Sequence, residues 1–404
     1  MMNDRLYYQD AYLQTFSAQI TKRGTEEDGT AYVVLSETAF YPTGGGQPCD
    51  LGLLMGIQVV DVEEIGGEVC HRLASSLPEE ITEVTGQIDW KRRFDHMQQH
   101  AGQHILSAAF LEVVQAETLA FHLGKERVTI DVRLDELTED VWTKVEQRAN
   151  QVVLENHPII ARFVDEAELA TLPLKKQPTV TENIRVVMIP DFDYNPCGGT
   201  HPARTSEVGM IKILGWERHR GNIRLEFICG WRALHDYTRK QATVRELARH
   251  LLTSEAELIE QTQRVIAERD LLKQTLMEKE KLLLGVEVQK QLARATALGN
   301  VRLIQVAFTD KTIQELQHFA QMMTAEAPDA VCLLAATGEK LQLVFARGQA
   351  ATVAVNQLIK ETLPLISGKG GGNPAMAQGG GQPVMAAEEV LAHARRLLEA
   401  ALEA

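Results

Sequence analysis

The sequence predicts a multidomain α+β protein with a small N-terminal β-barrel, an α+β domain, a long coiled-coil-like helix and a C-terminal α/β glycine-rich domain. Three observations lead to this prediction. Residues 1–90 contain β-branched runs separated by glycine-rich turns, which are typical of short strands. Residues 234–284 contain neither proline nor glycine, as expected of a long helix. Residues 298–404 alternate between strand-like and helix-like segments, and a chain of 404 residues has room for several domains.

The first segment, residues 1–90, contains two clear strand candidates, Ala31–Leu35 and Gly56–Val62. Between them, Phe40–Pro48 forms a loop with three consecutive glycines, which allow a backbone to come close to another group. A plain connection between two strands would account for the same residues. Both interpretations of the loop therefore stand at this point.

The second segment, residues 91–233, carries two clusters of potential metal ligands. His100 and His104 are four residues apart in a predicted helix, so both side chains lie on one face and can bind one ion. Cys197 and His201 bracket a Gly-Gly-Thr loop, whose glycines allow the backbone to turn tightly around a metal. Three imidazoles and one thiolate favour zinc over calcium or magnesium. We therefore predict one zinc ion per chain.

The rest of this segment fits an α+β pattern. Strands are predicted over Val128–Val132, Asn183–Ile189 and Ile223–Cys229, and an amphipathic helix over Thr138–Glu155. His96 continues the four-residue spacing, but about 12 Å of helix axis separates it from His104. That is too far for two Zn–N bonds of about 2.0–2.1 Å, so the metal pair is either His96 with His100 or His100 with His104.

The third segment, residues 234–297, contains pairs of apolar residues at intervals of about seven. The pairs begin at Leu251, Leu258, Val265 and Leu271. This heptad-like stripe predicts a long helix that ends near Gly285. Such a stripe needs a partner helix, either within the chain or in a second subunit, so a homodimer is one of two expected arrangements.

The last segment, residues 298–404, predicts an α/β domain. Its expected strands are Val301–Phe308, Ala330–Ala336 and Leu341–Ala346, and its expected helices are Ile313–Thr324, Val353–Thr362 and Ala386–Ala401. Gly368–Gln382 contains two glycine triplets and Lys369, and its backbone N–H groups can face an anion. A flexible linker is the alternative. The stretch is not a Walker loop, because Gly-Lys is not followed by Ser or Thr.

The formal charge of −14 argues against indiscriminate binding to nucleic acid. Two local basic groups, Lys91–Arg93 and Arg218–Arg224, flank the metal-ligand clusters and indicate a phosphate-bearing partner, although a solvated face would look the same. No apolar run approaches the roughly 18 residues of a membrane span, and the first residues lack an apolar signal core. We therefore expect a cytoplasmic protein with no membrane partner. The five cysteines show no paired framework and are expected to be reduced.

Several motifs together resemble a known family. His100-X3-His104, Cys197-Gly-Gly-Thr-His201, the upstream Phe40–Gln47 stretch and the terminal glycine-rich stretch occur in this order in the editing regions of alanyl-tRNA synthetases. The whole chain resembles the long form of the freestanding alanyl-tRNA editing proteins (AlaX), with Asp95–Leu106 as the most specific match. The last segment is similar to the DHHA1-type domain shared by DHH phosphoesterases and the synthetase C-terminus.

The resemblance implies a trans-acting editing hydrolase that deacylates mischarged tRNA(Ala), chiefly Ser-tRNA(Ala) and in some members Gly-tRNA(Ala). It implies binding of the tRNA(Ala) acceptor end, tRNA binding by the last segment, and a zinc site of His100, His104, Cys197 and His201. The candidate catalytic residues are Gln47, Thr43 and His100. The candidate substrate-binding or tRNA-binding residues are Gly44, Gly45, Gly46, Arg92, Arg93, Arg220, Lys369, Gly370, Gly371 and Gly372.

Two roles for the zinc are open at this point. The metal either activates water, or it orders the pocket and anchors the acylated adenosine while Gln47 and backbone N–H groups organise the water. Thr43, Gln47 and the Thr118–His122 stretch are expected to line a pocket that hydrogen-bonds the serine hydroxyl. Such a site rejects alanine, because its polar groups are then left unpaired.

Gln103 and Asp193 are expected to orient the metal ligands, and His96 is expected either in the core or at the tRNA end. Two other functions compete with editing. One is a non-catalytic, zinc-stabilised tRNA- or RNA-binding protein, since a closed four-ligand zinc site is usually structural. The other is a phosphoesterase that uses the last segment. That chemistry needs a cluster of metal-binding acidic residues, and here Asp95-His96 is followed by Met97 in place of a second histidine.

Overall fold

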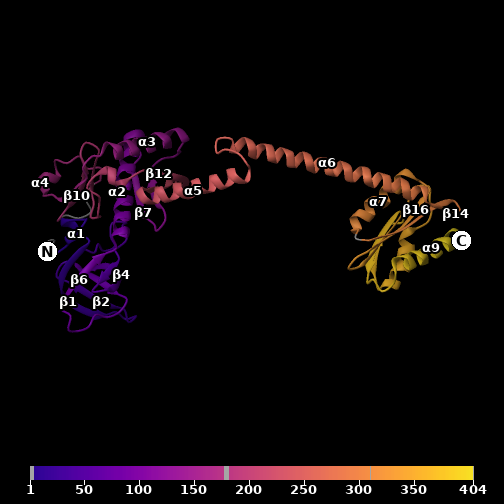
Figure 1. Cartoon of the computed structure of the whole chain (residues 1–404), viewed down its shortest axis with the longest axis horizontal. Helices are drawn as coiled ribbons and strands as arrows, with labels where there is room; N and C mark the ends of the chain where they lie inside the picture. Colours follow the sequence, from indigo (N-terminus) through magenta and orange to yellow (C-terminus); the bar gives the residue numbers. More distant parts are fainter. Residues whose placement is uncertain (1–3, 177–181, 310, 404) are drawn as a thin grey trace. The chain divides into compact units, whose positions relative to one another are not determined.

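The computed structural model describes residues 4–176, 182–309 and 311–403. The chain divides into two compact units, Met1–His250 and Leu251–Ala404 (Figure 1). This boundary lies within the predicted helical segment, so the start of that segment belongs to the first unit. Within the described residues, no helix is both long enough and apolar enough to cross a membrane.

The first unit begins with a short helix, α1 (Leu6–Gln9), followed by a closed six-stranded barrel. Around the barrel the strands follow the order β1 (Thr15–Thr25), β2 (Ala31–Leu35), β5 (Glu68–Leu73), β4 (Ile57–Ile65), β3 (Gly52–Leu54) and β6 (Glu83–Ile88). Every second residue of β5 and β6 is buried, as expected of strands with one face in a core. The predicted N-terminal barrel is confirmed, and Phe40–Pro48 lies in the connection between β2 and β3.

Two further sheets and several helices complete the first unit. One sheet has the strand order β12 (Ile211–His219), β13 (Asn222–Cys229), β8 (Val128–Val132) and β7 (Thr118–Leu123), and the other has the order β11 (Asp193–Pro196), β10 (Arg185–Ile189) and β9 (Ile160–Phe163). The helical elements are α2 (Trp90–Val114), α3 (Glu139–Glu155), α4 (Glu166–Leu169), the 3-10 turn η1 (Thr205–Val208) and α5 (Gly230–His250). Phe110, Val152 and Phe227 share one core, which joins α2, α3 and the four-stranded sheet.

The mostly buried helix α2 carries the histidine cluster. It begins after Asp89, whose carboxylate accepts a hydrogen bond from the Arg92 backbone N–H over 3.1 Å and so caps the helix. Gly102 allows α2 to pack closely on the end of β13, because a Cβ at this position would lie 2.2 Å from Cys229 Sγ. The glycine between the two histidines therefore serves the packing of the helix that presents them.

The predicted continuous helix is interrupted. α5 ends at His250, and α6 (Leu258–Ala293) begins only after a break. Within the break, the Ser254 hydroxyl hydrogen-bonds Glu257 over 2.9 Å, a local contact that competes with helix formation. The predicted end near Gly285 is also wrong, because α6 continues through this glycine. A single glycine costs a helix only about 1 kcal/mol.

The second unit contains α6 and a six-stranded sheet. The strand order is β14 (Thr296–Leu298), β15 (Val301–Thr309), β16 (Ala330–Thr337), β17 (Leu341–Arg347), β19 (Met376–Gly381) and β18 (Lys369–Gly372). The other helical elements are α7 (Ile313–Glu326), α8 (Val355–Thr362), the 3-10 turn η2 (Leu363–Ile366) and α9 (Ala387–Glu403). Val288 of α6 and Phe319 of α7 belong to one core against the sheet, and Ile359 of α8 and Leu391 of α9 belong to another. The predicted C-terminal α/β architecture is confirmed.

The glycine-rich stretch of this unit, expected as an anion-binding segment or a flexible linker, forms a β-hairpin with β18 at the edge of the sheet. Lys369 pairs with Gly380 in the β18–β19 ladder, so many of its N–H groups are engaged within the sheet. The glycines make room for η2: a Cβ at Gly379 would lie 2.6 Å from Leu363 Cδ2, and one at Gly381 would lie 2.3 Å from the Ile366 carbonyl oxygen. Close packing explains why this stretch is so rich in glycine.

Candidate metal centre

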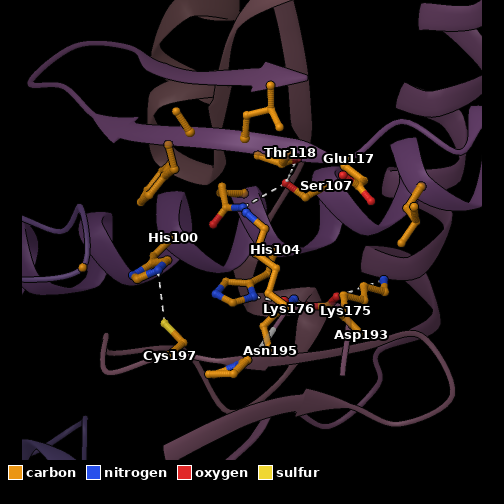
Figure 2. A pocket seen from close by; sticks show the side chains of 17 residues that line it. His100, His104, Ser107, Glu117, Thr118, Lys175, Lys176, Asp193, Asn195 and Cys197 are labelled. Atoms are coloured by element: carbon orange, nitrogen blue, oxygen red, sulfur yellow. Dashed lines mark hydrogen bonds and ion pairs between the residues drawn. The ribbon is translucent and has the colours of Figure 1, made fainter. Parts of the chain in front are cut away.

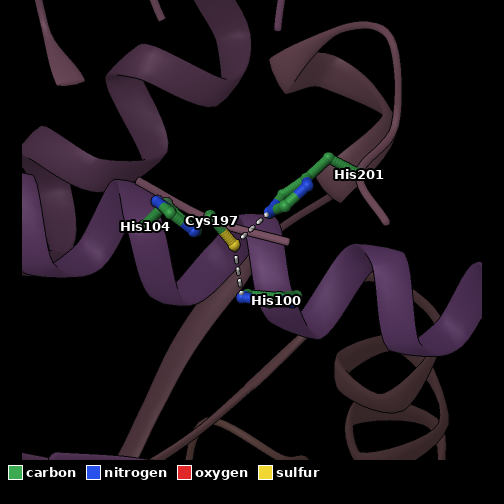
Figure 3. A group of neighbouring side chains, drawn as sticks. All are labelled: His100, His104, Cys197 and His201. Atoms are coloured by element: carbon green, nitrogen blue, oxygen red, sulfur yellow. Dashed lines mark hydrogen bonds between the residues drawn. The ribbon is translucent and has the colours of Figure 1, made fainter. Parts of the chain in front are cut away.

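The four predicted metal ligands lie together inside the first unit (Figure 3). His100 and His104 come from α2, and Cys197 and His201 come from the loop after β11. Their ligand atoms all lie within 4.8 Å of one another, and Cys197 Sγ lies 3.4 Å from His100 Nε2 and 3.8 Å from His201 Nε2. Ligand atoms of a tetrahedral zinc site lie about 3.3–3.8 Å apart, given bonds of about 2.0–2.3 Å. The cluster therefore has the spacing to hold one metal ion.

Two of the imidazole rings are oriented by buried hydrogen-bond partners. His100 Nδ1 lies 2.9 Å from Gln47 Oε1, and His104 Nδ1 lies 3.1 Å from Asp193 Oδ2. When these Nδ1 atoms donate, the Nε2 atoms are left as acceptors for a metal ion, which is the usual arrangement around histidine ligands. His201 Nδ1 is buried and has no partner among the described residues.

Gln47 is fully buried and both ends of its amide are engaged. Its Oε1 also accepts the Thr200 N–H over 3.1 Å, and its Nε2 donates to Thr200 Oγ1 over 2.8 Å. One side chain from the barrel loop thus joins a histidine ligand on α2 to the loop that carries Cys197 and His201. The amide therefore supports the segments that carry the candidate ligands, and the expected role of Gln47 in organising water stays a prediction.

The electrostatics of the cluster favour the metal-binding form of the thiol. Burial raises the pKa of Cys197, but the neighbouring His100 and His201 outweigh it and bring that pKa well below its ordinary value. Burial lowers the pKa of His201 to about 3. At His104 burial acts in the same direction, but the hydrogen bond to Asp193 outweighs it and raises the pKa to about 10. A thiolate beside imidazoles is the donor set that a soft or borderline metal ion prefers.

A pocket of about 330 Å³ opens beside the cluster (Figure 2). It lies between α2, β7 and β11. The lining residues are Gly45, His100, Gln103, His104, Ser107, Leu111, Glu117, Thr118, Leu119, Ala120, Phe121, Lys175, Lys176, Asp193, Asn195, Pro196 and Cys197. Ser107 Oγ accepts hydrogen bonds from Gln103 Nε2 (2.9 Å) and Thr118 Oγ1 (2.7 Å), and the Phe121 ring stacks on His100 with centroids 5.2 Å apart. Most of the Thr118–His122 stretch therefore lies in the pocket wall, as predicted.

Several other predicted residues lie outside this pocket. Thr43 is exposed, and its hydroxyl accepts the Cys49 N–H within the same connection. Arg220 is exposed in the β12–β13 turn. His96 is buried and does not belong to the ligand cluster. Lys369 and the three glycines that follow it belong to the other unit.

Arg93 is a correction to the predicted tRNA-binding set. Its side chain is fully buried, and its Nε lies 2.8 and 2.9 Å from the two carboxylate oxygens of Asp50. Its Nη1 donates to the Ala11 carbonyl over 3.0 Å. The guanidinium therefore joins α2 to the N-terminal segment and is not available to RNA. The adjacent Arg92 is only partly buried and donates to the Cys49 carbonyl.

Three residues of the site had not been predicted. Arg185 is buried and donates to the carbonyls of Cys197 and Gly199 over 2.9 and 2.8 Å, so it holds the cysteine loop. Lys175 Nζ lies 3.0 Å from Asp193 Oδ1, and Asn195 donates to Asp193 Oδ2 over 2.7 Å. The one available signal was the charge of Arg185 within the otherwise apolar strand β10, since a buried arginine needs hydrogen-bond acceptors.

Family models match three parts of the chain: the second additional domain of threonyl and alanyl tRNA synthetases over residues 184–226, class II (A) tRNA synthetases over residues 2–92, and the DHHA1 domain over residues 300–403. The alanyl-tRNA editing protein AlaX-L of Pyrococcus horikoshii is 33% identical over 394 residues, which are 94% of this chain and 94% of that protein.

The alanine–tRNA ligases of Thermococcus kodakarensis and Methanoregula boonei are each 31% identical, over 97% and 99% of this chain. The matched part spans only 43% and 44% of those ligases. Among solved structures, the C-Ala domain of Aquifex aeolicus alanyl-tRNA synthetase matches 27% of this chain and 98% of that domain, with 26% identity and a TM-score of 0.25.

Proposed function

The chain belongs to the AlaX-L family of alanyl-tRNA editing proteins, and on that premise we propose that it hydrolyses the ester bond of mischarged tRNA(Ala), chiefly Ser-tRNA(Ala) and also Gly-tRNA(Ala). The His₃Cys cluster at the edge of a pocket with both polar and apolar lining residues carries this proposal. In the reaction, water adds its oxygen to the acyl carbon while the bond from that carbon to the ribose oxygen breaks. The ribose oxygen takes up a proton, so the products are free amino acid and uncharged tRNA.

The donor set suits zinc, and we assign one zinc ion per chain to His100, His104, Cys197 and His201. When bound there, zinc supplies a Lewis acid beside the pocket that receives the ester. The protein's own part is to hold the ligand rings: Gln47 and Asp193 bind their Nδ1 atoms, and Arg185 holds the cysteine loop. His100 thus serves as a ligand, with Gln47 as its positioning residue.

The pocket wall supports a preference for serine over alanine. A volume of about 330 Å³ is at the lower end of small-ligand pockets, which fits an aminoacyl group better than a whole nucleotide. Ser107 Oγ already accepts two hydrogen bonds, from Gln103 and Thr118, so its own proton is free to donate. The hydroxyl of a seryl group can accept this proton, whereas an alanyl group leaves it unpaired.

The second unit supports tRNA binding in this proposal. Its match to the DHHA1 domain and the exposed side chain of Lys369 on the edge strand β18 are the supporting observations. Gly370, Gly371 and Gly372 continue this edge and keep its backbone free of side chains, so that a phosphate backbone can come close. A chain that ends at residue 250 should therefore bind tRNA(Ala) more weakly than the full chain.

The apolar stripe of α6 supports self-association through this helix. Leu271, Leu272 and Leu283 are 64%, 61% and 70% exposed, and exposed apolar rows of this size usually mark an interaction surface. We assign this surface to a second copy of the chain. Sedimentation of a Leu272→Glu variant tests the assignment, because a monomeric full chain in both forms would contradict it.

The decisive experiment is a deacylation assay on Ser-, Gly- and Ala-tRNA(Ala), with and without a metal chelator. We expect rapid turnover of the seryl ester, slower turnover of the glycyl ester, very slow turnover of the alanyl ester, and loss of activity on chelation. Failure to hydrolyse any of the three would refute editing. Tight tRNA binding without turnover would instead favour a non-catalytic, zinc-stabilised RNA-binding protein, the function that ranks second.

A further inference from the structure

A groove with aromatic walls lies between the first turns of α2 and the start of α5. Trp90 and Phe94 line it from α2, and Trp231 and His235 line it from α5, around a volume of about 470 Å³. The Trp90 and Phe94 ring centroids are 5.5 Å apart, and those of Trp231 and His235 are 6.0 Å apart. Trp231 is 55% exposed. Flat apolar faces on both walls, one of them open to solvent, suit a planar ring as ligand.

A basic pocket of about 500 Å³ adjoins the aromatic one and shares Lys91, Asp95 and Arg232 with it. Its charged lining residues are Asp89, Lys91, Arg92, Asp95, Lys125 and Arg232. Asp95 is already paired with Arg232 over 2.6 Å. Neither Lys91 nor Lys125 forms an ion pair with any part of the chain that the structure describes. In a protein of net charge −14, this local surplus of positive charge indicates an anionic ligand.

Contacts between several elements hold the two pockets together, and α2 joins them to the metal cluster. Arg232 binds Asp95 and also donates to the Gly124 carbonyl over 2.9 Å, so it joins α5, α2 and the β7–β8 hairpin. His96 lines the basic pocket and is only 4% exposed. Its Nδ1 has no partner among the described residues. His96 lies one helical turn before His100, about 6 Å along the axis.

We propose that this aromatic–basic groove binds the single-stranded 3′ end of the tRNA substrate, upstream of the terminal aminoacylated adenosine. One base stacks on Trp231, and Lys91 and Lys125 contact the flanking phosphates. The combination of aromatic faces and unpaired cations is the one by which proteins hold single-stranded nucleic acid. This inference rests on the proposed function, because it places the aminoacyl end in the metal-centre pocket, one helical turn away.

Kinetics on two substrates test the proposal. Trp231→Ala should raise the KM for Ser-tRNA(Ala) by between about 5-fold and 150-fold, the range for loss of one base–aromatic stack, with little change in kcat. Trp231→Phe keeps a stacking face and should restore most of the affinity. Hydrolysis of 3′-O-seryl-adenosine should be the same in all three proteins, since this substrate has no upstream nucleotide. Trp216→Ala, at a 40% exposed tryptophan on β12, is the matched control.

Binding of a labelled single-stranded RNA that ends in CCA tests the phosphate contacts without catalysis. Lys91→Ala and Lys125→Ala should each reduce the slope of log Kd against log salt by about 0.7, the value for one phosphate contact on a single strand. Lys144→Ala, at an exposed lysine of α3, should leave the slope unchanged.

The possible outcomes separate the groove from the editing activity. Suppose that the wild type deacylates Ser-tRNA(Ala) and that the KM of Trp231→Ala is within twofold of the wild-type KM. This result would overturn RNA binding in the groove and leave the editing activity in place. If no ester is hydrolysed, the editing function fails. An unchanged Kd for the RNA in Trp231→Ala, Lys91→Ala and Lys125→Ala would then overturn RNA binding in the groove as well. A changed sedimentation coefficient with an unchanged KM in Trp231→Ala would assign the groove to a second copy of the chain and refute RNA binding there.

Discussion

Replacement of Gln47 by alanine should weaken zinc binding, although the residue lies outside the ligand set. Its amide makes three hydrogen bonds, one to His100 Nδ1 and two to Thr200, at 2.8–3.1 Å. The substitution leaves the His100 Nδ1–H buried and unpaired, which costs about 1–3 kcal/mol. Loss of such a supporting partner typically weakens metal affinity by about 10–100-fold, or about 1.4–2.7 kcal/mol. The two estimates agree, so we expect the Kd for zinc to rise by about 10–100-fold.

Competition against a zinc-binding dye measures this change directly. Thr43→Ala is the matched control, because Thr43 lies in the same barrel loop but is exposed and away from the cluster. Gln47→Glu should keep most of the affinity, since a carboxylate also accepts the His100 N–H. If Gln47→Ala bound zinc as tightly as the wild type and lost only its discrimination between serine and alanine, Gln47 would act on the substrate. The positioning role inferred from the structure would then be wrong.

Three further substitutions test the packing around the site. Arg93→Met should lower the free energy of unfolding by about 3–5 kcal/mol in urea titrations, because Asp50 is left as a buried, unpaired carboxylate; a loss below about 1 kcal/mol would contradict a buried ion pair. Burial lowers the pKa of His71 from 6.5 to about 4, so below pH 6.5 the unfolded chain takes up a proton that the folded chain does not. The free energy of unfolding should therefore decrease as the pH is lowered, by about 2 kcal/mol at pH 5. His71→Gln should remove that part of the pH dependence, and an equal dependence of stability on pH in the wild type and the variant would refute it. Gly102→Ala should cost about 1–3 kcal/mol and reduce zinc content, because its Cβ would meet a buried sulfur at 2.2 Å, whereas Gly215→Ala has open space and should be neutral.

The fold follows from the sequence wherever hydrophobic periodicity is strong. β2 and β8 coincide with the predicted Ala31–Leu35 and Val128–Val132, and α3 begins one residue after the predicted Thr138. β8 alternates and α3 has helical spacing because one face of each enters a core, whereas β2 is a continuous run of apolar residues bounded by turns. The break before α6 was not predictable in this way, since Ser254 and Glu257 are ordinary helix-surface residues unless their side chains bond each other.

In the candidate site, too, some features were predictable from the sequence and others were not. The four candidate metal ligands were expected together, but the four-residue spacing alone left His96 and His104 as alternatives, and only the family resemblance selected His104. How deeply a side chain is buried is not visible in the sequence. Arg92 and Arg93 are adjacent arginines, yet only Arg93 is fully buried, where it pairs with Asp50. In the sequence, a glycine that makes room for a neighbouring group looks the same as one that approaches a phosphate, so the close packing of the β18–β19 hairpin on η2 was not predictable.

The three-way hydrogen bonding of Gln47 has a consequence for local unfolding. Because one amide joins the barrel loop, α2 and the Cys197–His201 loop, these segments can open only together while it is in place. Metal release would loosen His100 and with it the anchor of the tight Gly44–Gln47 turn. In hydrogen-exchange measurements, the backbone amides of that turn and of Thr200 should lose protection as a single cooperative unit. We therefore expect metal occupancy to set how long the Gly44–Gln47 turn stays ordered.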